Sequence, residues 1–180
     1  TLSIATFNLF NLNQPGLPLY RDSDGWSAEE HERKIEWTAR IVGFLKSDVF
    51  AFQELWHRDS LAAAVERAGL SSEYDLLLPP DANGTKIVCA AMVGKGLLTG
   101  TPEWITGFPE QFKLQSGGDD PQTPQIEVRI DGFSRPVLHF TIAPRDDEPD
   151  IHDYVCHCKS TAPTEGFREP CYLAAEAFHG

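Results

Sequence analysis

The chain has 180 residues, a hydrophobic content of 41%, an aromatic content of 11% and a formal net charge of −12 at pH 7. These values are typical of one folded domain with a substantial core, and they exclude a disordered chain. The acidic balance argues against broad electrostatic adhesion to nucleic acid or anionic membrane, although a bound divalent cation can supply positive charge locally. No apolar run approaches the roughly 20 residues that span a bilayer, so we expect one domain over residues 1–180 without a membrane span.

The first predicted element is a strand over residues 2–9, where apolar and small side chains alternate. Asn8 lies near its end, and asparagine is poor inside strands but common where they stop. The polar residues, proline and glycine of 11–16 then predict a loop.

A helix follows, because Ser27 and Glu30 have the spacing of a capping box. Apolar or small side chains recur at helical spacing after it and predict the buried stripe. Its members are Ile35, Thr38, Ala39, Val42 and Leu45, widened by Ile41 and Phe44. The helix is expected to end near Lys46.

Residues 48–55 form the most apolar predicted strand, and the strand ends in the polar pair Gln53 and Glu54. Strict alternation places Phe50, Phe52 and Glu54 on one face. A carboxylate at the tip of a buried strand needs a positively charged partner, because an unpaired buried charge costs several kcal/mol. With the preceding strand and helix, this segment predicts a strand-helix-strand crossover.

The middle of the chain predicts one short helix and several short strands. The expected elements are a helix over Asp59–Ala68 closed by Gly69, strands over Tyr74–Leu78 and Ile87–Val93, a hairpin turn at Asn83 and Gly84, a further strand from Leu97, and a long loop over Thr106–Gln125.

The last third predicts an antiparallel meander and a final helix. The meander strands are Ile126–Ile130, Pro136–Ile142 and Ile151–Lys159, and the helix is expected to begin at Thr164 and to run to Gly180. Because the chain stops directly after this helix, we expect the 180 residues to be the N-terminal part of a larger domain.

Four cysteines follow no disulfide framework and no common zinc spacing. They are Cys89, Cys156, Cys158 and Cys171. We interpret all four as small buried residues, which mildly favours a reducing, cytoplasmic compartment. An alternative is a zinc module that uses Cys156, His157, Cys158 and Cys171, but strand alternation directs His157 away from its two neighbouring cysteines.

Four polar residues at or near strand ends could together carry chemistry on a phosphate. Glu54 could bind Mg2+, which takes one or two carboxylates and keeps several waters, and Asn8 could bind a phosphate oxygen or a metal-bound water. His157 could donate to a phosphoryl oxygen, and Arg135 offers a planar fork that matches phosphate. We interpret His139 as structural.

Four segments resemble the motifs of the endonuclease/exonuclease/phosphatase superfamily, to which deoxyribonuclease I belongs. They are Ile4–Leu9, Asp48–Glu54, Phe133–Pro136 and Val155–Ser160, in the order of the family's motifs. The resemblance implies an α/β fold of two packed, mostly antiparallel sheets flanked by helices, a four-layer sandwich of which the first two-thirds is present. It also implies that Glu54, with Asn8, binds Mg2+ or Mn2+, that Asn8 and His157 are catalytic, and that Arg135 contacts phosphate.

The sequence departs from the family at two places, because a Gly-Asp-x-Asn segment and a closing Asp-His pair are missing. The chain therefore has a metal anchor but no base to activate water, and we expect the 180 residues alone not to hydrolyse phosphodiesters. The resemblance implies a metal-dependent phosphoesterase that acts on DNA or RNA. The alternatives are a hydrolase of small phosphoesters, of the inositol-phosphate or sphingomyelin type, and a non-catalytic binding module that keeps the fold.

Overall fold

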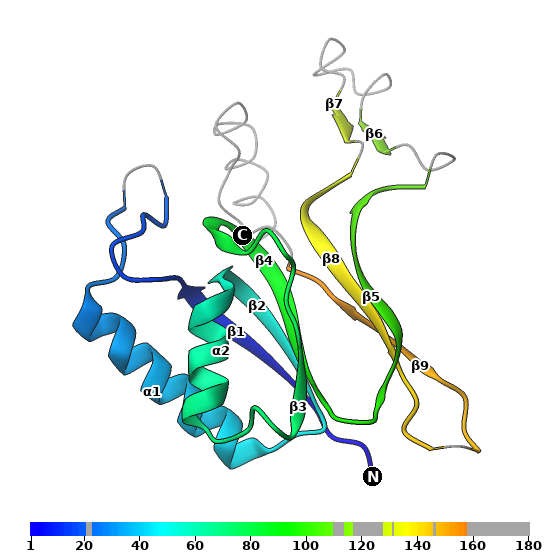
Figure 1. Cartoon of the computed structure of the whole chain (residues 1–180). Coiled ribbons are helices and arrows are strands. Elements are labelled where there is room, and N and C mark those ends of the chain that lie inside the picture. Colours follow the sequence, from blue (N-terminus) through cyan, green and yellow to red (C-terminus); the bar gives the residue numbers. More distant parts are fainter. Residues whose placement is uncertain (21–22, 110–113, 117–127, 131, 146, 158–180) are drawn as a thin grey trace, which may run out of the picture.

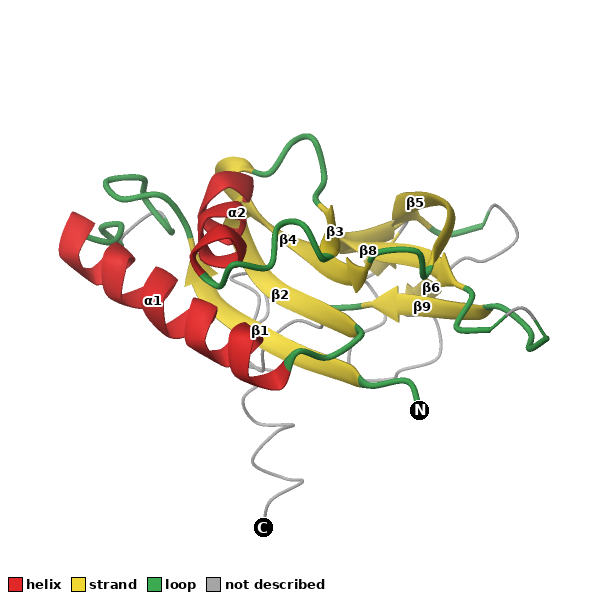
Figure 2. Ribbon diagram, turned by 60° about the horizontal axis from the view of Figure 1, so that its bottom comes forward, coloured by secondary structure: helices red, strands yellow, loops and turns green. Residues whose placement is uncertain are grey.

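The computed structural model describes residues 1–20, 23–109, 114–116, 128–130, 132–145 and 147–157. Two β-sheets pack together, and two helices cover the other face of the first sheet (Figure 1, Figure 2). The predicted α/β class with two mostly antiparallel sheets is confirmed. The helix predicted from Thr164 to Gly180 lies outside the described residues. Neither helix is long and apolar enough to cross a membrane.

The first sheet has the strand order β1-β2-β4-β3. Its strands are β1 (Ile4–Leu12), β2 (Val49–His57), β3 (Tyr74–Leu77) and β4 (Asn83–Gly94). The strand β1 runs parallel to β2, and the other neighbours are antiparallel. The helix α1 (Ala28–Leu45) connects the parallel pair, so the predicted crossover is confirmed. Because the two strands run in the same direction, their carboxyl ends meet at one edge of the sheet.

The helix α1 begins as predicted, since both hydrogen bonds of the Ser27–Glu30 capping box are present. Ile35, Thr38, Ala39 and Val42 are buried, but Leu45 is 49% exposed and Phe44 is 85% exposed. The prediction that Phe44 belongs to the buried stripe is wrong. Position 44 lies two residues beyond Val42, about 200° around the helix and therefore on its opposite side.

The helix α2 (Arg58–Arg67) begins one residue before the predicted start. The His57 ring accepts a hydrogen bond from the Asp59 amide, and Gly69 follows the helix with φ +73°. The strands β3 and β4 pair as expected, but Asn83 and Gly84 already belong to β4. The predicted turn position is therefore wrong, because the chain reverses earlier, over residues 78–82.

The second sheet has the order β5-β8-β9, and a separate small sheet pairs β6 with β7. The bounds are β5 Leu98–Gly107, β6 Leu114–Ser116, β7 Val128–Ile130, β8 Gly132–Ile142 and β9 Ile151–Val155. The predicted pairing of β7 with β8 is wrong: β7 pairs with β6, and β5 follows β8 as far as Gly132. The predicted loop was too long, since β5 extends through Gly107 and β6 lies within it. The strand β9 ends at Val155, before the predicted Lys159, which lies outside the described residues.

Two layers of core meet at the first sheet. Phe50, Phe52 and Leu55 of β2 pack in the cluster that includes the helix residues Ile35 and Val42. A second set lies between the sheets and comprises Val49, Leu77, Cys89, Ala91, Val93, Leu138, Phe140, Ile142 and Val155. Burial of Cys89 is confirmed, whereas Cys156 is exposed, against the prediction. This double burial fixes β2, so the polar residues at its end have a rigid support.

Candidate functional site

A β-bulge in β2 places Glu54. Phe52 pairs with Ala90 and Leu55 with Val88, so three steps on β2 match two steps on β4. Glu54 has φ +58°, in the left-handed region. The extra residue returns Leu55 to the core cluster of Phe52 and directs Glu54 towards His157, which follows β9 of the second sheet. The predicted shared face of Phe50, Phe52 and Glu54 is therefore wrong.

A second irregularity lies beside the first, in β1. Asn8 pairs with Gln53 and Leu12 with Leu55, so β1 contains two more residues than β2 over this stretch. Phe10 and Asn11 have φ values of 49° and 56°. Of the four non-glycine residues with positive φ in the described part of the chain, three therefore lie at these two strand ends; the fourth, Lys46, caps α1. Such residues cost about 1–2 kcal/mol each and cluster at functional sites.

The strained backbone supplies hydrogen bonds to the Glu54 carboxylate. Asn8 Nδ2 donates to Glu54 Oε1 at 3.0 Å, and the Asn11 backbone N–H donates to Oε2 at 3.2 Å. The Asn8 side-chain oxygen accepts from the Phe10 N–H at 2.8 Å. Asn8 therefore bridges the bulge of β1 and the carboxylate on β2. The sequence indicated Asn8 and Glu54, but it gave no sign of the bulges that bring them together.

Asn11 is the centre of a ring of aromatic donors. Its side-chain oxygen accepts from Trp56 Nε1 and from the Tyr20 hydroxyl, each at 3.0 Å, and its backbone carbonyl accepts from Trp26 Nε1 at 2.7 Å. These bonds hold Asn11 in its left-handed conformation, so its amide stays aimed at Glu54. Sequence reasoning missed this residue. The only signal was its place in the asparagine-rich run after the first strand.

Lys34 reaches the same segment from α1. Its ammonium donates to the carbonyls of Leu9 at 3.2 Å and Phe10 at 2.9 Å. It also lies 4.5 Å from the centre of the Trp26 ring and 5.0 Å from that of Phe10. Burial lowers the pKa of Lys34, and the nearby Glu54 charge opposes this effect. Lys34 thus clamps the bulge and adds positive charge behind Glu54.

His157 approaches Glu54 from the end of β9, and Arg135 of β8 lies close enough to His157 to act on it electrostatically. His157 Nε2 lies 3.8 Å from Glu54 Oε1, and the two side chains are 14% and 18% exposed. Burial lowers the pKa of His157, the positive charge of Arg135 lowers it further, and Glu54 raises it. The net effect is a lowered pKa of His157, which favours the neutral form of the imidazole. The structure therefore brings together all four residues that the sequence indicated.

A groove of about 380 Å³ adjoins this group on the side of Arg135. Its lining combines aromatic and basic side chains: Tyr20, Trp56, Lys86, Ile87, Phe133, Ser134, Arg135 and Pro136. Tyr20 and Phe133 are exposed there. The groove can hold a planar group next to an anionic one.

The residues at Glu54 fit a hard cation with few protein ligands. One carboxylate is available, and Mg2+ commonly binds one or two carboxylates and retains water. Within the described ranges, no three His, Cys, Asp or Glu side chains are grouped to hold a metal ion. Asn8 directs its nitrogen to Glu54 and its oxygen to Phe10, so its role as a ligand stays a prediction. Cys158 and Cys171 of the alternative zinc module lie outside the described residues.

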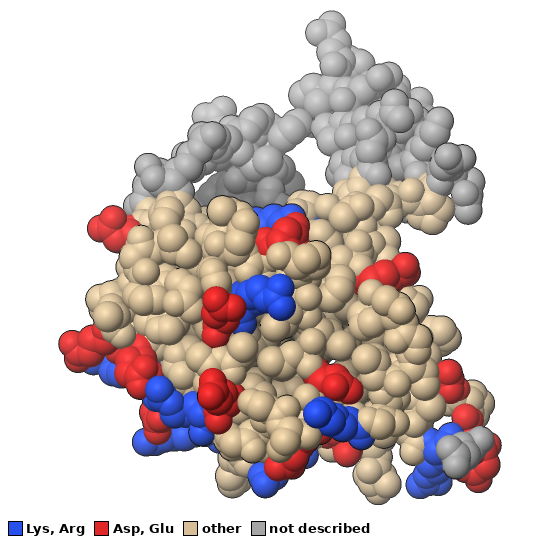
Figure 3. Space-filling view, viewed as in Figure 1, with Lys and Arg blue, Asp and Glu red and all other residues tan. Residues whose placement is uncertain are grey.

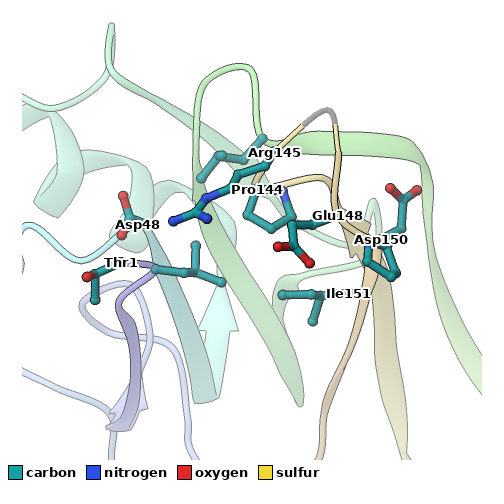
Figure 4. Close-up of a pocket in the computed structure, with 10 residues that line it drawn as sticks. Thr1, Asp48, Pro144, Arg145, Glu148, Asp150 and Ile151 are labelled. Carbon is teal, nitrogen blue, oxygen red and sulfur yellow. The ribbon is translucent and has the colours of Figure 1, made fainter.

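A second cavity, of about 500 Å³, lies at the opposite end of β2 (Figure 4). Thr1, Asp48, Arg145, Glu148 and Asp150 are among its lining residues. Asp48 is engaged locally, because Ser3 donates to its Oδ2 from the backbone at 2.7 Å and from the hydroxyl at 2.6 Å. None of the four indicated residues lines this cavity.

No family model and no curated protein matches the sequence. Solved structures do match. A structure of TDP2 from Caenorhabditis elegans aligns with 98% of this chain and 40% of its own, at a TM-score of 0.51 and 14% identity. A structure of a truncated form of that protein aligns with 98% of this chain and 52% of its own, at a TM-score of 0.51 and 17% identity. An endonuclease/exonuclease/phosphatase family protein from Leptotrichia buccalis C-1013-b covers all of this chain and 62% of its own at 14% identity, with a TM-score of 0.47, too low to carry an argument.

The chain thus spans about half or less of the length of the TDP2 structures that it matches. At this identity the likeness concerns the fold alone. The chain shares the fold of TDP2 over nearly all of its own length, and the resemblance predicted from the sequence is confirmed as a structural one.

Proposed function

We propose that this chain carries the metal-binding part of a phosphoesterase that depends on a divalent ion at Glu54, and that the 180 residues alone do not hydrolyse phosphodiesters. The observation that carries the proposal is the convergence of two bulged strand ends on one carboxylate beside the imidazole of His157. Backbone strain of this kind persists only where the surroundings enforce it. Mg2+ or Mn2+ at Glu54 would neutralise charge on a phosphoryl oxygen.

Each residue near Glu54 has a different proposed role around the phosphate. Glu54 would hold the metal ion, while Asn8 and the Asn11 amide fix the direction of the carboxylate. His157 would donate an N–H to a phosphoryl oxygen, where negative charge grows during hydrolysis. Arg135 offers two parallel N–H donors to a flanking phosphate.

The groove beside Arg135 supports a nucleic-acid phosphodiester as the substrate. Exposed aromatic rings can stack on a base, and Lys86 and Arg135 can contact the backbone. The net charge of −12 favours the second candidate, a small phosphoester, because it opposes a long polyanion. On the face shown in Figure 3, acidic and basic side chains are interspersed rather than separated by sign.

The metal role is tested by Mn2+ binding, followed by electron paramagnetic resonance. We expect Glu54→Gln to weaken binding by at least about tenfold, since the substitution removes the one carboxylate ligand. Asp48→Asn is the matched control, because it changes the acid at the other end of the same strand. Equal Mn2+ affinity of the parent protein and Glu54→Gln would contradict the proposal.

The substrate class is tested by binding of a short single-stranded oligonucleotide and of an inositol phosphate in the presence of Mg2+. Phe133→Ala should weaken oligonucleotide binding by roughly fivefold or more, because one stacked base is worth about 1–3 kcal/mol. It should leave inorganic phosphate binding unchanged. Preference for the inositol phosphate, with no effect of Phe133→Ala, would favour the small-phosphoester candidate.

A further inference from the structure

The outer face of the second sheet carries a pair of histidines on neighbouring strands. Leu138, Phe140 and Ile142 of β8 point into the core between the sheets, so the alternating residues His139 and Thr141 face outward. Tyr154 pairs with His139, and His152 pairs with Thr141. His139 and His152 are therefore diagonal neighbours on this face. Their facing nitrogens, His139 Nε2 and His152 Nδ1, are 3.1 Å apart.

The surroundings of the pair prepare His139 to act as a ligand through Nε2. The Glu103 carboxylate lies 3.4 Å from the other ring nitrogen, Nδ1. A carboxylate there favours the tautomer with its proton on Nδ1, which leaves a lone pair on Nε2; carboxylates support metal-binding histidines in the same way. The Tyr154 ring stacks on His139 at 4.6 Å and an interplanar angle of 20°. Its stacking fixes the plane of the imidazole.

The separation of the two nitrogens matches a shared metal ion. Ligand nitrogens bind transition metals at about 2.0–2.1 Å, so two of them in neighbouring positions of a square-planar or tetrahedral ion lie roughly 2.9–3.4 Å apart. The two rings are nearly coplanar, at 9°, with centres 5.3 Å apart. They face each other end to end, so the exposed His152 ring must tilt to direct both lone pairs at one ion.

We propose that His139 and His152 form a binding site for a borderline divalent transition metal, with Cu2+ bound more tightly than Ni2+ or Zn2+. Imidazole suits these ions, whereas Mg2+ prefers oxygen ligands. Glu103 faces the other nitrogen of His139, and no group of three or more His, Cys, Asp or Glu in the described part of the chain could hold a metal ion, so water completes the coordination. A bound ion would link β9 to β8 and stabilise the second sheet. This site is separate from Glu54 and does not depend on the proposed function.

The test uses the full chain with Glu54→Gln and His157→Gln, so that the candidate phosphoesterase site contributes no ligands. Cu2+ and Ni2+ are titrated by calorimetry. We expect one equivalent of metal, an affinity at least about tenfold lower after His152→Ala, and a smaller loss after Glu103→Gln. His31→Asn on α1 is the control and should leave the affinity unchanged. Unaltered affinity after His152→Ala would overturn the proposal.

Spectroscopy and thermal unfolding provide a second test. Imidazole nitrogen resonances of His139 and His152 should shift with Zn2+ and stay in place with Mg2+, and the Cu2+ complex should show splitting from two imidazole nitrogens. The melting temperature should rise with Ni2+ in the parent and not in His152→Ala. Unshifted resonances in a large excess of Zn2+ would show that the pair is a hydrogen bond only.

Discussion

The two ends of β2 each carry an acidic residue, and the two acids are held in opposite ways. Asp48 precedes the strand in ordinary backbone and accepts two hydrogen bonds from one residue, Ser3. Glu54 has a left-handed backbone and takes its donors from Asn8 and Asn11, in a second bulged strand. The first arrangement joins two chain segments. In the second arrangement, strained backbone at Glu54 and in the bulge of β1 places a carboxylate beside His157.

The comparison shows that the backbone conformation and the hydrogen-bond donors around an acidic residue, and not its residue type, distinguish a structural acid from a functional candidate. In the sequence both acids flank the same apolar run. The cavity at the Asp48 end has a volume of about 500 Å³, against about 380 Å³ for the groove near Glu54. Cavity size therefore favours the Asp48 end. Strained backbone and convergent donors point to Glu54.

The largest expected effect concerns the middle of β2, on which both ends depend. Phe52→Ala should lower the free energy of unfolding by about 3–5 kcal/mol, because a fully buried ring leaves a cavity between sheet and helices. Urea unfolding followed by circular dichroism measures the change. The matched control is Phe44→Ala, at an exposed position. It should change stability by less than about 0.5 kcal/mol, and a comparable loss in the control would contradict the assignment of the core.

Lys34 provides the next effect, because it clamps only the Glu54 end. Lys34→Met keeps the apolar stem but removes hydrogen bonds to two carbonyls, and should cost about 1–2 kcal/mol. Hydrogen exchange at the Asn11 amide should accelerate, while exchange at the Ser3 amide, which donates to Asp48, should stay unchanged. Arg40→Met on the exposed side of α1 is the control. Equal acceleration at both amides would show a global loss of stability and no local clamp.

Asp48→Asn should lower the stability of the protein without changing metal binding at Glu54. We expect a loss of about 1 kcal/mol in stability, because one charged acceptor of two hydrogen bonds is replaced at an exposed position. Mn2+ binding should be retained. If Asp48→Asn weakened Mn2+ binding as much as Glu54→Gln, the distinction between the two ends would fail.

The smallest effects are electrostatic. The two ends of β2 should lose their contributions to stability in different pH ranges. Burial and Arg135 lower the pKa of His157 below 6.5. As the pH falls, His157 therefore takes up a proton in the unfolded state before it does so in the folded state. Its contribution to stability is complete above pH 6.5 and is lost as the pH falls through the pKa of the folded state. Hydrogen bonds from Ser3 lower the pKa of Asp48 below 3.8, so its contribution is lost only at more acidic pH.

Nuclear magnetic resonance titration of His157 checks the first half of this statement. Arg135→Gln should raise the pKa of His157, since it removes a positive charge. Glu54→Gln should lower it, since it removes a negative one. Because burial lowers the pKa of His31 as well, stability is compared with that of His157→Gln. A pKa of His157 that responds to neither substitution would show that the three groups are not neighbours in solution.

Much of the fold was predictable because local patterns and tertiary packing agree. The capping box at Ser27, the crossover from β1 to β2 and the position of Asn8 and Glu54 at one edge of the sheet follow from periodicity and from the parallel direction of the strands. The bulges did not follow, because one inserted residue in β2 and two in β1 leave no trace in the apolar pattern. The pairing of β7 was missed because its adjacency to β8 in the sequence favoured a β7–β8 hairpin. In the structure, β5 pairs along β8 as far as Gly132, and β7 pairs with β6.

The ring around Asn11 has a practical consequence for spectroscopy. Two of the protein's four tryptophans, Trp26 and Trp56, give their indole N–H to this single asparagine. Any movement of the strand end that bears Asn8 must therefore disturb two fluorophores at once. The protein carries an intrinsic optical probe of its own candidate centre, and the emission of unlabelled samples should report occupancy there without a chemical tag.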